Sequence, residues 1–365
     1  MTSVLTIDLH AVVANYRSLK LHAAQAECGA VVKSNGYGLG LAHVAQALLT
    51  AGCRTFFITN TEEGIALRQA LAKHEPTVRI FVLSGPAQGA EDLIDAHNLI
   101  PVLSTIDQID QWAAHGRAHG ARPAAIKIDT GMTRLGLTTS DLITLESEPN
   151  RLDGITLTLV MSHLACADEP DNSWNTAQLS AFKLAHAKFP ATPASLANSA
   201  GIMLGPEYQF DLVRPGAALY GISTVQGRTN TMTPVVTLEG KILQLRHVDR
   251  KTSVGYGATH RVPAGRLIAT VAVGYGDGYP RSLSNRGAGF VDNIRVPIVG
   301  RVSMDLVTFD VTDVPESRLR AKGFIDLIGP HYSIDDLAAD ADTIGYEILT
   351  RLGRRFRRVH IGGDS

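Results

Sequence analysis

Short apolar runs alternate with helix-like stretches between about residues 10 and 225, and this alternation limits the possible folds more than any other feature of the chain. The helix-like stretches are rich in Ala, Leu and Gln: Leu9–Ala23, Gly40–Ala51, Thr61–Ala72, Gly89–His97, Ile106–His119 and Asn175–Lys188. The strand-like runs between them are Cys28–Val32, Thr55–Ile58, Ile80–Leu83, Ile100–Leu103, Ala124–Ile128, Leu157–Met161 and Pro193–Ala197. Repeated strand–helix units predict a parallel sheet, and about eight of them close into a (β/α)8 TIM barrel.

The second part of the chain has a different pattern. Past Thr224–Gly227 the helical stretches become rare, and short β-rich runs appear between Gly, Pro and Asn-Arg-Gly turns. We therefore predict an α/β chain with a barrel over residues 1–226 and a smaller, mostly-β domain over residues 227–365. A doubly wound open sheet is the competing architecture for the first part, but no Gly-x-Gly-x-x-Gly sequence follows the first strand.

Charge and cysteine content exclude several classes of protein. The formal net charge is −1 and the basic residues are spread along the chain, which argues against a nucleic-acid-binding surface. The run of arginines from Arg351 to Arg358 is interpreted as a solvated face. The three cysteines have no metal-site or disulfide spacing, so we expect no metal and a reducing compartment. Without a signal-peptide pattern or a membrane-length apolar stretch, we expect a cytoplasmic protein that does not associate with membranes.

Lys33 is the first residue that points to chemistry. It follows Ala30–Val32 at the end of a predicted strand, and a Gly-rich turn comes directly after it. A lysine that is partly removed from water has a lowered pKa and becomes a nucleophile able to form a Schiff base. The alternative for this residue alone is a surface lysine that leaves a strand.

Polar residues follow several later strands as well. These clusters are Lys127–Gly136, Met161–His163, Ala197–Gly201 and Val213–Gly221. In a barrel these strand ends would meet on one face and bring a lysine, a histidine and two arginines together. Gly-rich turns with hydroxyl and N–H groups also bind phosphate oxygens well.

With these motifs, the chain resembles the alanine racemase family, pyridoxal 5'-phosphate (PLP)-dependent enzymes of fold-type III, over nearly its full length. The likeness rests on Ala30–Gly38, Asp129–Gly136, Arg214–Gly221, Val254–Gly257, Gly274–Arg281 and Gly300–Asp305. It implies a barrel followed by a β domain, with residues 1–8 pairing with the latter. It also implies a head-to-tail homodimer with shared active sites, and a cytoplasmic isomerase that supplies D-alanine for peptidoglycan.

The resemblance assigns two catalytic residues. Lys33 resembles the lysine that holds PLP covalently and, once substrate frees it, handles the proton on the D side. Tyr256 resembles the base for the L side, which the partner subunit supplies. Two bases suit racemisation, because a proton leaves one face of the carbon atom and returns on the other.

The remaining assignments concern cofactor and substrate. Arg214 resembles the arginine that faces the pyridine nitrogen, where a guanidinium can only donate, and His163 resembles the residue that holds it. The positions that match phosphate-binding residues are Tyr37, Ser199, Gly216 and Ala217.

Other residues match positions on the substrate side of the site. Arg134 matches the arginine at the phenolic oxygen and the substrate carboxylate, and Lys127 matches a lysine that is carbamylated in some relatives. Those that match the substrate entrance and carboxylate side are Tyr275, Met304 and Asp305.

One position departs from the family pattern. Many relatives carry a phosphate-binding tyrosine where this chain offers Gly353 or Arg354. Either Arg354 or Arg355 compensates, or the affinity for the cofactor is lower.

Three other functions remain open. They are a racemase of serine or of broader specificity, a decarboxylase of the same fold type, and a non-catalytic PLP carrier. Arg214 argues against the decarboxylase, and Tyr256 in its Gly-Tyr-Gly context argues against the carrier, which lacks the β domain. Whether the role is biosynthetic or catabolic also stays open.

Overall fold

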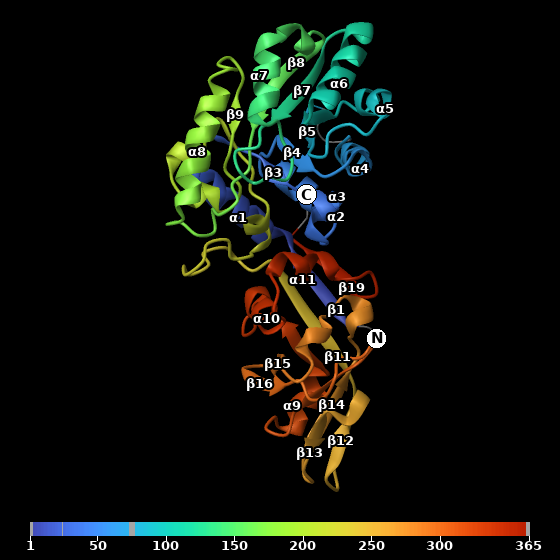
Figure 1. The fold of residues 1–365 in the computed structure, drawn as a ribbon. Helices are drawn as coiled ribbons and strands as arrows, with labels where there is room; N and C mark the ends of the chain where they lie inside the picture. The colour runs from blue at the N-terminus through green and yellow to red at the C-terminus, as the bar shows by residue number, and fades with distance from the viewer. Residues whose placement is uncertain (1–2, 24, 73–76, 363–365) are drawn as a thin grey trace. The chain divides into compact units, whose positions relative to one another are not determined.

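The computed structural model describes residues 3–23, 25–72 and 77–362. The chain divides into two compact units, residues 12–233 and residues 1–11 with 234–365 (Figure 1). The division at residue 233 lies a few residues beyond the boundary proposed from the sequence. Of the N-terminal segment expected to pair with the β domain, residues 1 and 2 lie outside the described part.

The first unit contains a closed ring of parallel strands. Seven of them are adjacent in chain order: β3 (Ala30–Val31), β4 (Thr55–Ile58), β5 (Arg79–Val82), β6 (Ile100–Leu103), β7 (Arg122–Lys127), β8 (Ile155–Met161) and β9 (Ala194–Ser195). The eighth, β10 (Leu212–Val213), pairs with β2 (Glu27–Cys28), which leads directly into β3. On the other side, the Arg214 N–H donates to Ala197 O at 3.0 Å, next to β9. The predicted barrel is therefore confirmed.

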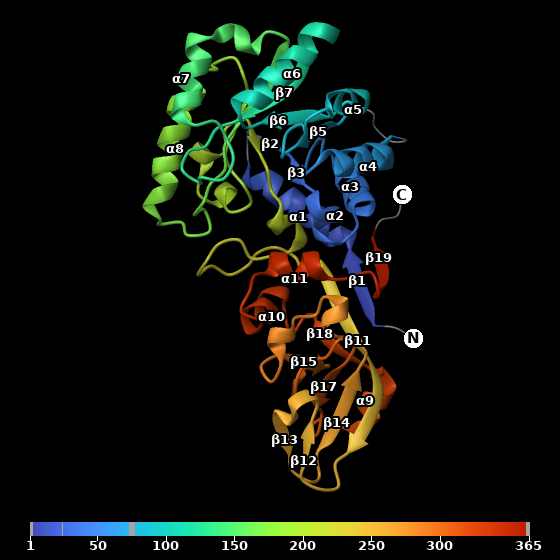
Figure 2. The same ribbon diagram turned by 45° about the vertical axis from the view of Figure 1, so that its right-hand side comes forward.

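Helices connect these strands and lie outside the ring (Figure 1, Figure 2). They are α1 (Leu9–His22), α2 (Lys33–Tyr37), α3 (Leu41–Thr50), α4 (Thr61–Leu71), α5 (Glu91–Ala96), α6 (Ile106–His119), α7 (Thr139–Ser147) and α8 (Ser173–His186). The sequence pattern does not reveal α7, whose Thr and Ser residues have modest helix propensity. Its start is fixed by a capping box, in which Thr138 accepts from the Asp141 N–H and Asp141 accepts from the Thr138 N–H.

The interior of the ring is apolar. The buried cluster consists of Phe57, Phe81, Ile100, Val102, Ala125, Leu159, Met161 and Leu212. The rings of Phe57 and Phe81 stack with centroids 5.0 Å apart. Burial of each large side chain contributes about 1.5–3 kcal/mol, so this core fixes the positions of the strand ends.

The second unit is mostly β, as predicted. Its eight-stranded sheet has the order β16 (Ile294–Pro297), β15 (Ala288–Val291), β18 (Phe324–Ile328), β11 (Val236–His247), β1 (Val4–Asp8) and β19 (Arg357–Ile361), with β14 (Leu267–Val271) beside β11 and β17 (Val307–Asp310) beside β14. A hairpin joins β12 (Thr252–Val254) to β13 (His260–Val262). The strand β1 thus lies between β11 and β19, within the β unit.

Three short helices complete this unit: α9 (Glu316–Lys322), α10 (Ile334–Asp340) and α11 (Gly345–Arg351). Each has seven residues, too few for apolar periodicity to reveal them in the sequence.

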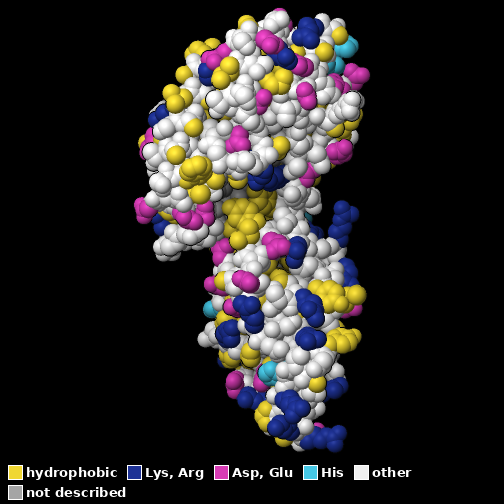
Figure 3. All heavy atoms as spheres, in the orientation of Figure 1, with side chains coloured by type: hydrophobic (Ala, Val, Ile, Leu, Met, Phe, Trp, Pro, Cys, Tyr) yellow, Lys and Arg dark blue, Asp and Glu magenta, His cyan; other side chains and the backbone are white. Residues whose placement is uncertain are grey.

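In the described ranges no helix has the length and apolar character required to cross a membrane. On the face shown in Figure 3, basic side chains lie scattered among acidic ones.

A close contact between α6 and the turn before β8 yields a test of this fold. A Cβ at Gly116 would lie 1.9 Å from Gly154 O. Alanine has a higher helix propensity than glycine by about 1 kcal/mol, yet we expect Gly116→Ala to lower the free energy of unfolding by at least about 1–3 kcal/mol through overpacking. Urea denaturation measures the change. Gly329→Ala, where the nearest atom would be Asp326 Cβ at 3.7 Å, is the control. A stabilised Gly116→Ala variant would contradict this packing.

Candidate active site

Basic side chains gather at the carboxyl ends of the barrel strands. Lys33 follows β3, Lys127 ends β7, and Arg214 follows β10. Arg134 lies in the loop after β7, and His163 lies in the loop after β8. Each lysine and the histidine has a pKa affected by other members of this group, so the barrel brings together the residues that the sequence pattern pointed to.

Lys33 is a partly desolvated amine. Burial, and then the positive charge of Arg134, lower the pKa of Lys33, while Glu63 raises it. A lowered pKa increases the neutral fraction of the amine, which is its nucleophilic form.

The backbone after Lys33 forms a left-handed turn. The φ angles of Ser34, Asn35, Gly36 and Tyr37 are 54°, 56°, 63° and 52°. Left-handed non-glycine residues cost about 1–3 kcal/mol each, so strain is concentrated beside the amine. Several bonds hold the turn: among them, Gly36 N–H donates to Val32 O at 2.8 Å, and Asn35 Oδ1 accepts from the Leu41 N–H at 2.9 Å.

A cluster of hydroxyl and backbone groups lies beside this turn. A Cβ at Gly216 would lie 2.4 Å from the Tyr37 hydroxyl oxygen. Ser199 Oγ accepts from the N–H groups of Gly216 at 2.9 Å and Ala218 at 3.3 Å. Ala217 is buried beside them. The four residues matched to phosphate binding are therefore contiguous, and such a cradle of hydroxyl and backbone groups suits phosphate oxygens.

Arg214 is buried and held by acceptors that carry no charge. Its Nη1 donates to Ser195 Oγ, and its Nη2 donates to the main-chain oxygens of Ser162 and Leu196. Burial lowers the pKa of Arg214 to about 9. None of these bonds involves His163, whose predicted contact with Arg214 stays a prediction. Ser162 lies within the predicted Met161–His163 cluster but has no role assigned there, and Ser195 is not singled out, since serine at a strand end carries no distinctive signal.

His163 lies among these cations. Burial, and then the charges of Arg214 and Lys127, lower the pKa of His163 well below its usual range. The imidazole is therefore neutral near pH 7, so it can accept as well as donate a hydrogen bond.

The loop that carries Arg134 is fixed by a carboxylate. Asp129 Oδ1 accepts from the N–H groups of Gly131, Met132 and Thr133 at 2.9–3.1 Å.

Lys127, at the end of β7, is also partly removed from water. Burial, and then the charges of Arg214 and Arg134, lower the pKa of Lys127 to about 8. Lys127 is thus a second lysine in this group with a lowered pKa, and part of it is neutral near pH 7.

The remaining predicted residues belong to the C-terminal unit. Tyr256 begins a short turn after β12, and its side chain is 74% exposed. Tyr275 and Met304 are also exposed, and their loops are joined by the bond from the Tyr275 N–H to Ser303 O at 3.0 Å. These loop tips offer aromatic and thioether surface that the chain itself leaves open.

The arginines near the C-terminus differ in their bonding. Arg355 donates from Nε to Asp277 and from Nη1 to Asp305, each at 2.7 Å. These carboxylates raise the pKa of Arg355. Arg355 is therefore used in joining two loops, which leaves the exposed Arg354 as the candidate to compensate for the missing tyrosine.

Comparison with known proteins identifies the family. Residues 7–224 match the model described as alanine racemase, N-terminal domain, and residues 235–360 match alanine racemase, C-terminal domain. The chain belongs to the alanine racemase family. It is 53% identical to the alanine racemase of Rhodospirillum rubrum, over 99% of this chain and 96% of that protein. It is 47% identical to a catabolic alanine racemase of Agrobacterium fabrum, over 98% of this chain and 92% of that protein.

A solved structure agrees with this assignment to the alanine racemase family. The alanine racemase of Bartonella henselae, crystallised with covalently bound pyridoxal phosphate, has a TM-score of 0.93 to this chain at 39% identity. The likeness covers 99% of this chain and 100% of that structure. The chain is therefore an enzyme of the alanine racemase family.

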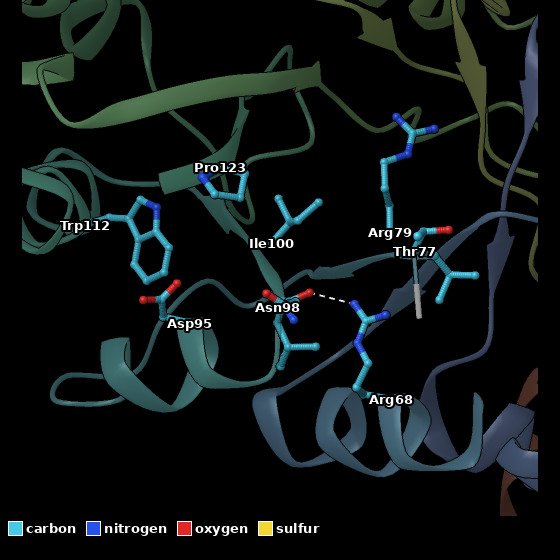
Figure 4. A pocket seen from close by; sticks show the side chains of 10 residues that line it. Arg68, Thr77, Arg79, Asp95, Asn98, Ile100, Trp112 and Pro123 are labelled. Atoms are coloured by element: carbon cyan, nitrogen blue, oxygen red, sulfur yellow. Dashed lines mark hydrogen bonds between the residues drawn. The ribbon is translucent and has the colours of Figure 1, made fainter. Parts of the chain in front are cut away.

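One cavity in this family member lies away from the candidate residues. It has a volume of about 260 Å³ and is lined by residues at the amino ends of β5, β6 and β7, including Arg79, Ile100 and Pro123 (Figure 4). Arg68 donates to Asn98 O at 2.6 Å at its edge. The predicted site residues of the barrel lie at the opposite ends of the strands, and no predicted site residue lines this cavity. The described residues contain no group of three His, Cys, Asp or Glu suited to a metal ion.

Proposed function

We propose that this protein interconverts L-alanine and D-alanine with PLP held on Lys33, using Lys33 and Tyr256 as two bases. The observation that carries the proposal is the amine of Lys33, whose pKa is lowered by burial at the charged end of a barrel of the alanine racemase family. The related protein of Bartonella henselae carries its pyridoxal phosphate covalently, as a lysine of this kind would allow.

The residues present fit this cofactor. Ser199 Oγ, the open Gly216 backbone, Tyr37 and Ala217 would hold the phosphate, whose negative charge suits the surrounding cations. Arg214 would donate toward the ring nitrogen, because a guanidinium has no acceptor to offer. Bound PLP supplies an electron sink for the charge that develops on the α-carbon of the amino acid.

The protein would perform the proton transfers. Lys33 Nζ would remove or return the α-proton on one face, and the Tyr256 hydroxyl would do so on the other. Arg134 would bind the substrate carboxylate, for which a planar guanidinium is well shaped. Tyr275, Met304 and Asp305 would form the substrate entrance.

We further propose a head-to-tail homodimer in which Tyr256 of the partner subunit completes each site. The exposed Tyr256 and Tyr275 side chains support this, because a second copy would cover them. We propose a cytoplasmic role in supplying D-alanine for peptidoglycan. The catabolic name of the Agrobacterium fabrum relative makes D-alanine breakdown the second candidate.

The first experiment is racemisation of L-alanine by the purified protein, measured by chiral chromatography with and without added PLP. L-serine and L-lysine are tested alongside. PLP-dependent conversion of alanine above the others is expected. Faster conversion of serine or lysine would change the substrate but keep the mechanism. Bound PLP without any conversion would favour a carrier protein.

Lys33→Ala tests the covalent attachment of the cofactor. We expect the visible absorbance of PLP to be lost on dialysis, and racemisation to disappear, because the covalent bond to the cofactor is assigned to Lys33. Absorbance spectroscopy after dialysis measures the first effect. Lys183→Ala, on the exposed face of α8, is the control and should retain both properties. A Lys33→Ala variant that keeps its absorbance would refute the assignment.

Tyr256→Phe tests the second base. Removal of the hydroxyl should lower kcat by about 10²–10⁴-fold, the usual contribution of a general acid or base. The absorbance of bound PLP should persist, since Lys33 is intact. Tyr332→Phe serves as the control, because that hydroxyl bonds Asp340 and has no assigned role. Full activity in Tyr256→Phe would end the two-base proposal.

The pKa of about 8 for Lys127 favours carbamylation, because the neutral amine is the form that reacts with carbon dioxide. About a tenth of the amine is neutral at pH 7, against less than a thousandth for an ordinary lysine. We expect a carbamate signal by NMR in ¹³C-bicarbonate at pH 8, and its decline by pH 6 as the amine becomes protonated. Lys127→Ala should abolish the signal and Lys33→Ala should not. A signal that persists in Lys127→Ala would assign the carbamate elsewhere.

A further inference from the structure

Gln178 is a buried polar residue that the sequence pattern does not single out. It lies on α8, and its side chain is 0% exposed. The side-chain amide of Gln178 bonds to two loops: Oε1 accepts from the Ala165 N–H at 2.8 Å, and Nε2 donates to Thr130 Oγ1 at 3.2 Å and to His163 O at 3.0 Å. A buried amide satisfied in this way fixes its partners, because an unmade bond there would cost about 1–3 kcal/mol.

Those partners belong to the two loops that carry candidate site residues. Thr130 begins the loop that presents Arg134, directly after Asp129. His163 and Ala165 lie in the loop after β8. Gln178 therefore joins the Arg134 loop to the His163 loop. It does so from the helix α8 and not from the end of a barrel strand.

Hydrogen bonds continue from Thr130 toward Arg214, and the donor and acceptor of each can be assigned. Ser162 Oγ donates to Ile128 O at 2.7 Å, and a carbonyl oxygen can only accept. The 2.8 Å bond between the Thr130 and Ser162 hydroxyls must therefore be donated by Thr130. Thr130 in turn accepts from Gln178.

The carbonyl oxygen of Ser162 accepts from Arg214 Nη2. An ordered chain thus leads from Gln178 through Thr130 and Ser162 to the guanidinium that would face the cofactor ring.

We propose that Gln178 is a positioning residue for this reaction, which sets Arg134 and Arg214 through the chain of Thr130 and Ser162. The inference rests on the proposed racemase function. Gln178 touches neither substrate nor cofactor in this proposal. Its amide is required because it accepts at one end and donates twice at the other, a combination that neither glutamate nor methionine provides.

Two variants of Gln178 test the proposal in the full-length protein with PLP. Gln178→Met removes the polar contacts at similar size. Gln178→Glu keeps the acceptor for Ala165 but, as a carboxylate, places an oxygen opposite His163 O and draws the Thr130 proton away from Ser162. We expect kcat/KM for L-alanine to fall about 10–100-fold, as small displacements of binding groups do. Because Arg134 is displaced, KM for L-alanine should rise in both variants.

The visible spectrum of bound PLP should also shift, since Arg214 faces its ring. A residue that only stabilised the fold would change neither KM nor the spectrum.

Gln209 provides a matched control. It is also buried in the barrel unit, and its Nε2 donates to the main-chain oxygens of His22 and Ile202, remote from this chain of bonds. Gln209→Met should lower the unfolding midpoint without altering KM or the spectrum. Equal kinetic effects in Gln178→Met and Gln209→Met would overturn the proposal.

Thr130→Val keeps the inference testable if Gln178 variants fold poorly. It interrupts the same chain at its centre, so it should reproduce the rise in KM and the spectral shift. Combined with Gln178→Met it should add little further loss, because both changes break one chain. Additive effects on kcat/KM, or wild-type kinetics in Thr130→Val, would refute the chain.

Hydrogen exchange tests the role of Gln178 in fixing the two loops independently of any racemase activity. Peptides covering residues 129–137 and 162–165 should exchange faster in Gln178→Met than in Gln209→Met. Unchanged exchange would show that Gln178 does not fix the loops. A wild-type protein that racemises no amino acid would refute the proposed function, while the exchange data would still decide whether Gln178 joins the two loops.

Discussion

Mutual repulsion among cations at one end of the barrel is the constraint on which this site depends. Besides burial, Arg134 lowers the pKa of Lys33, and Arg214, Arg134 and Lys33 lower that of Lys127. Burial and all four of these cations lower the pKa of His163, and few carboxylates oppose them. Asp129 and Glu63 are the acidic residues that raise the pKa of the two lysines. Like charges in a partly dry site are unfavourable. An anionic ligand would relieve this repulsion, as the phosphate and carboxylate groups of the proposed cofactor and substrate would do.

Much of this arrangement could be predicted, because the topology of a parallel barrel brings the residues that follow its strands to one face. Lys33, His163 and Arg214 each follow an apolar run, and the carboxyl ends of the barrel strands share one face. The closure of the barrel could not be predicted from the pattern of apolar runs alone. The strands β2 and β10 have two residues each, too short for a periodic signal, yet their pairing completes the ring.

The bonding partners inside the site could not be predicted. Ser34, Asn35 and Tyr37 adopt a left-handed conformation that asparagine tolerates but serine and tyrosine rarely adopt, and bonds between Asn35 and both Leu41 and Glu63 hold it. Partners such as Gln178 and Thr130, 48 residues apart, meet only once α8 packs on the barrel. Sequence spacing identifies groups that carry chemistry, whereas the groups that orient them are ordinary residues whose role depends on tertiary contacts.

Arg214 and Arg355 show how partners decide what one residue type can do. Arg355 is bonded to the carboxylates of Asp277 and Asp305, so its charge is balanced and its effect is to join loops. Arg214 is bonded to a hydroxyl and to main-chain oxygens, which orient the guanidinium without neutralising it. A carboxylate beside Arg214 would cancel the positive field at the strand ends. The uncharged acceptors therefore keep that field available to a ligand, and they make the orientation of Arg214 depend on the loops that supply them.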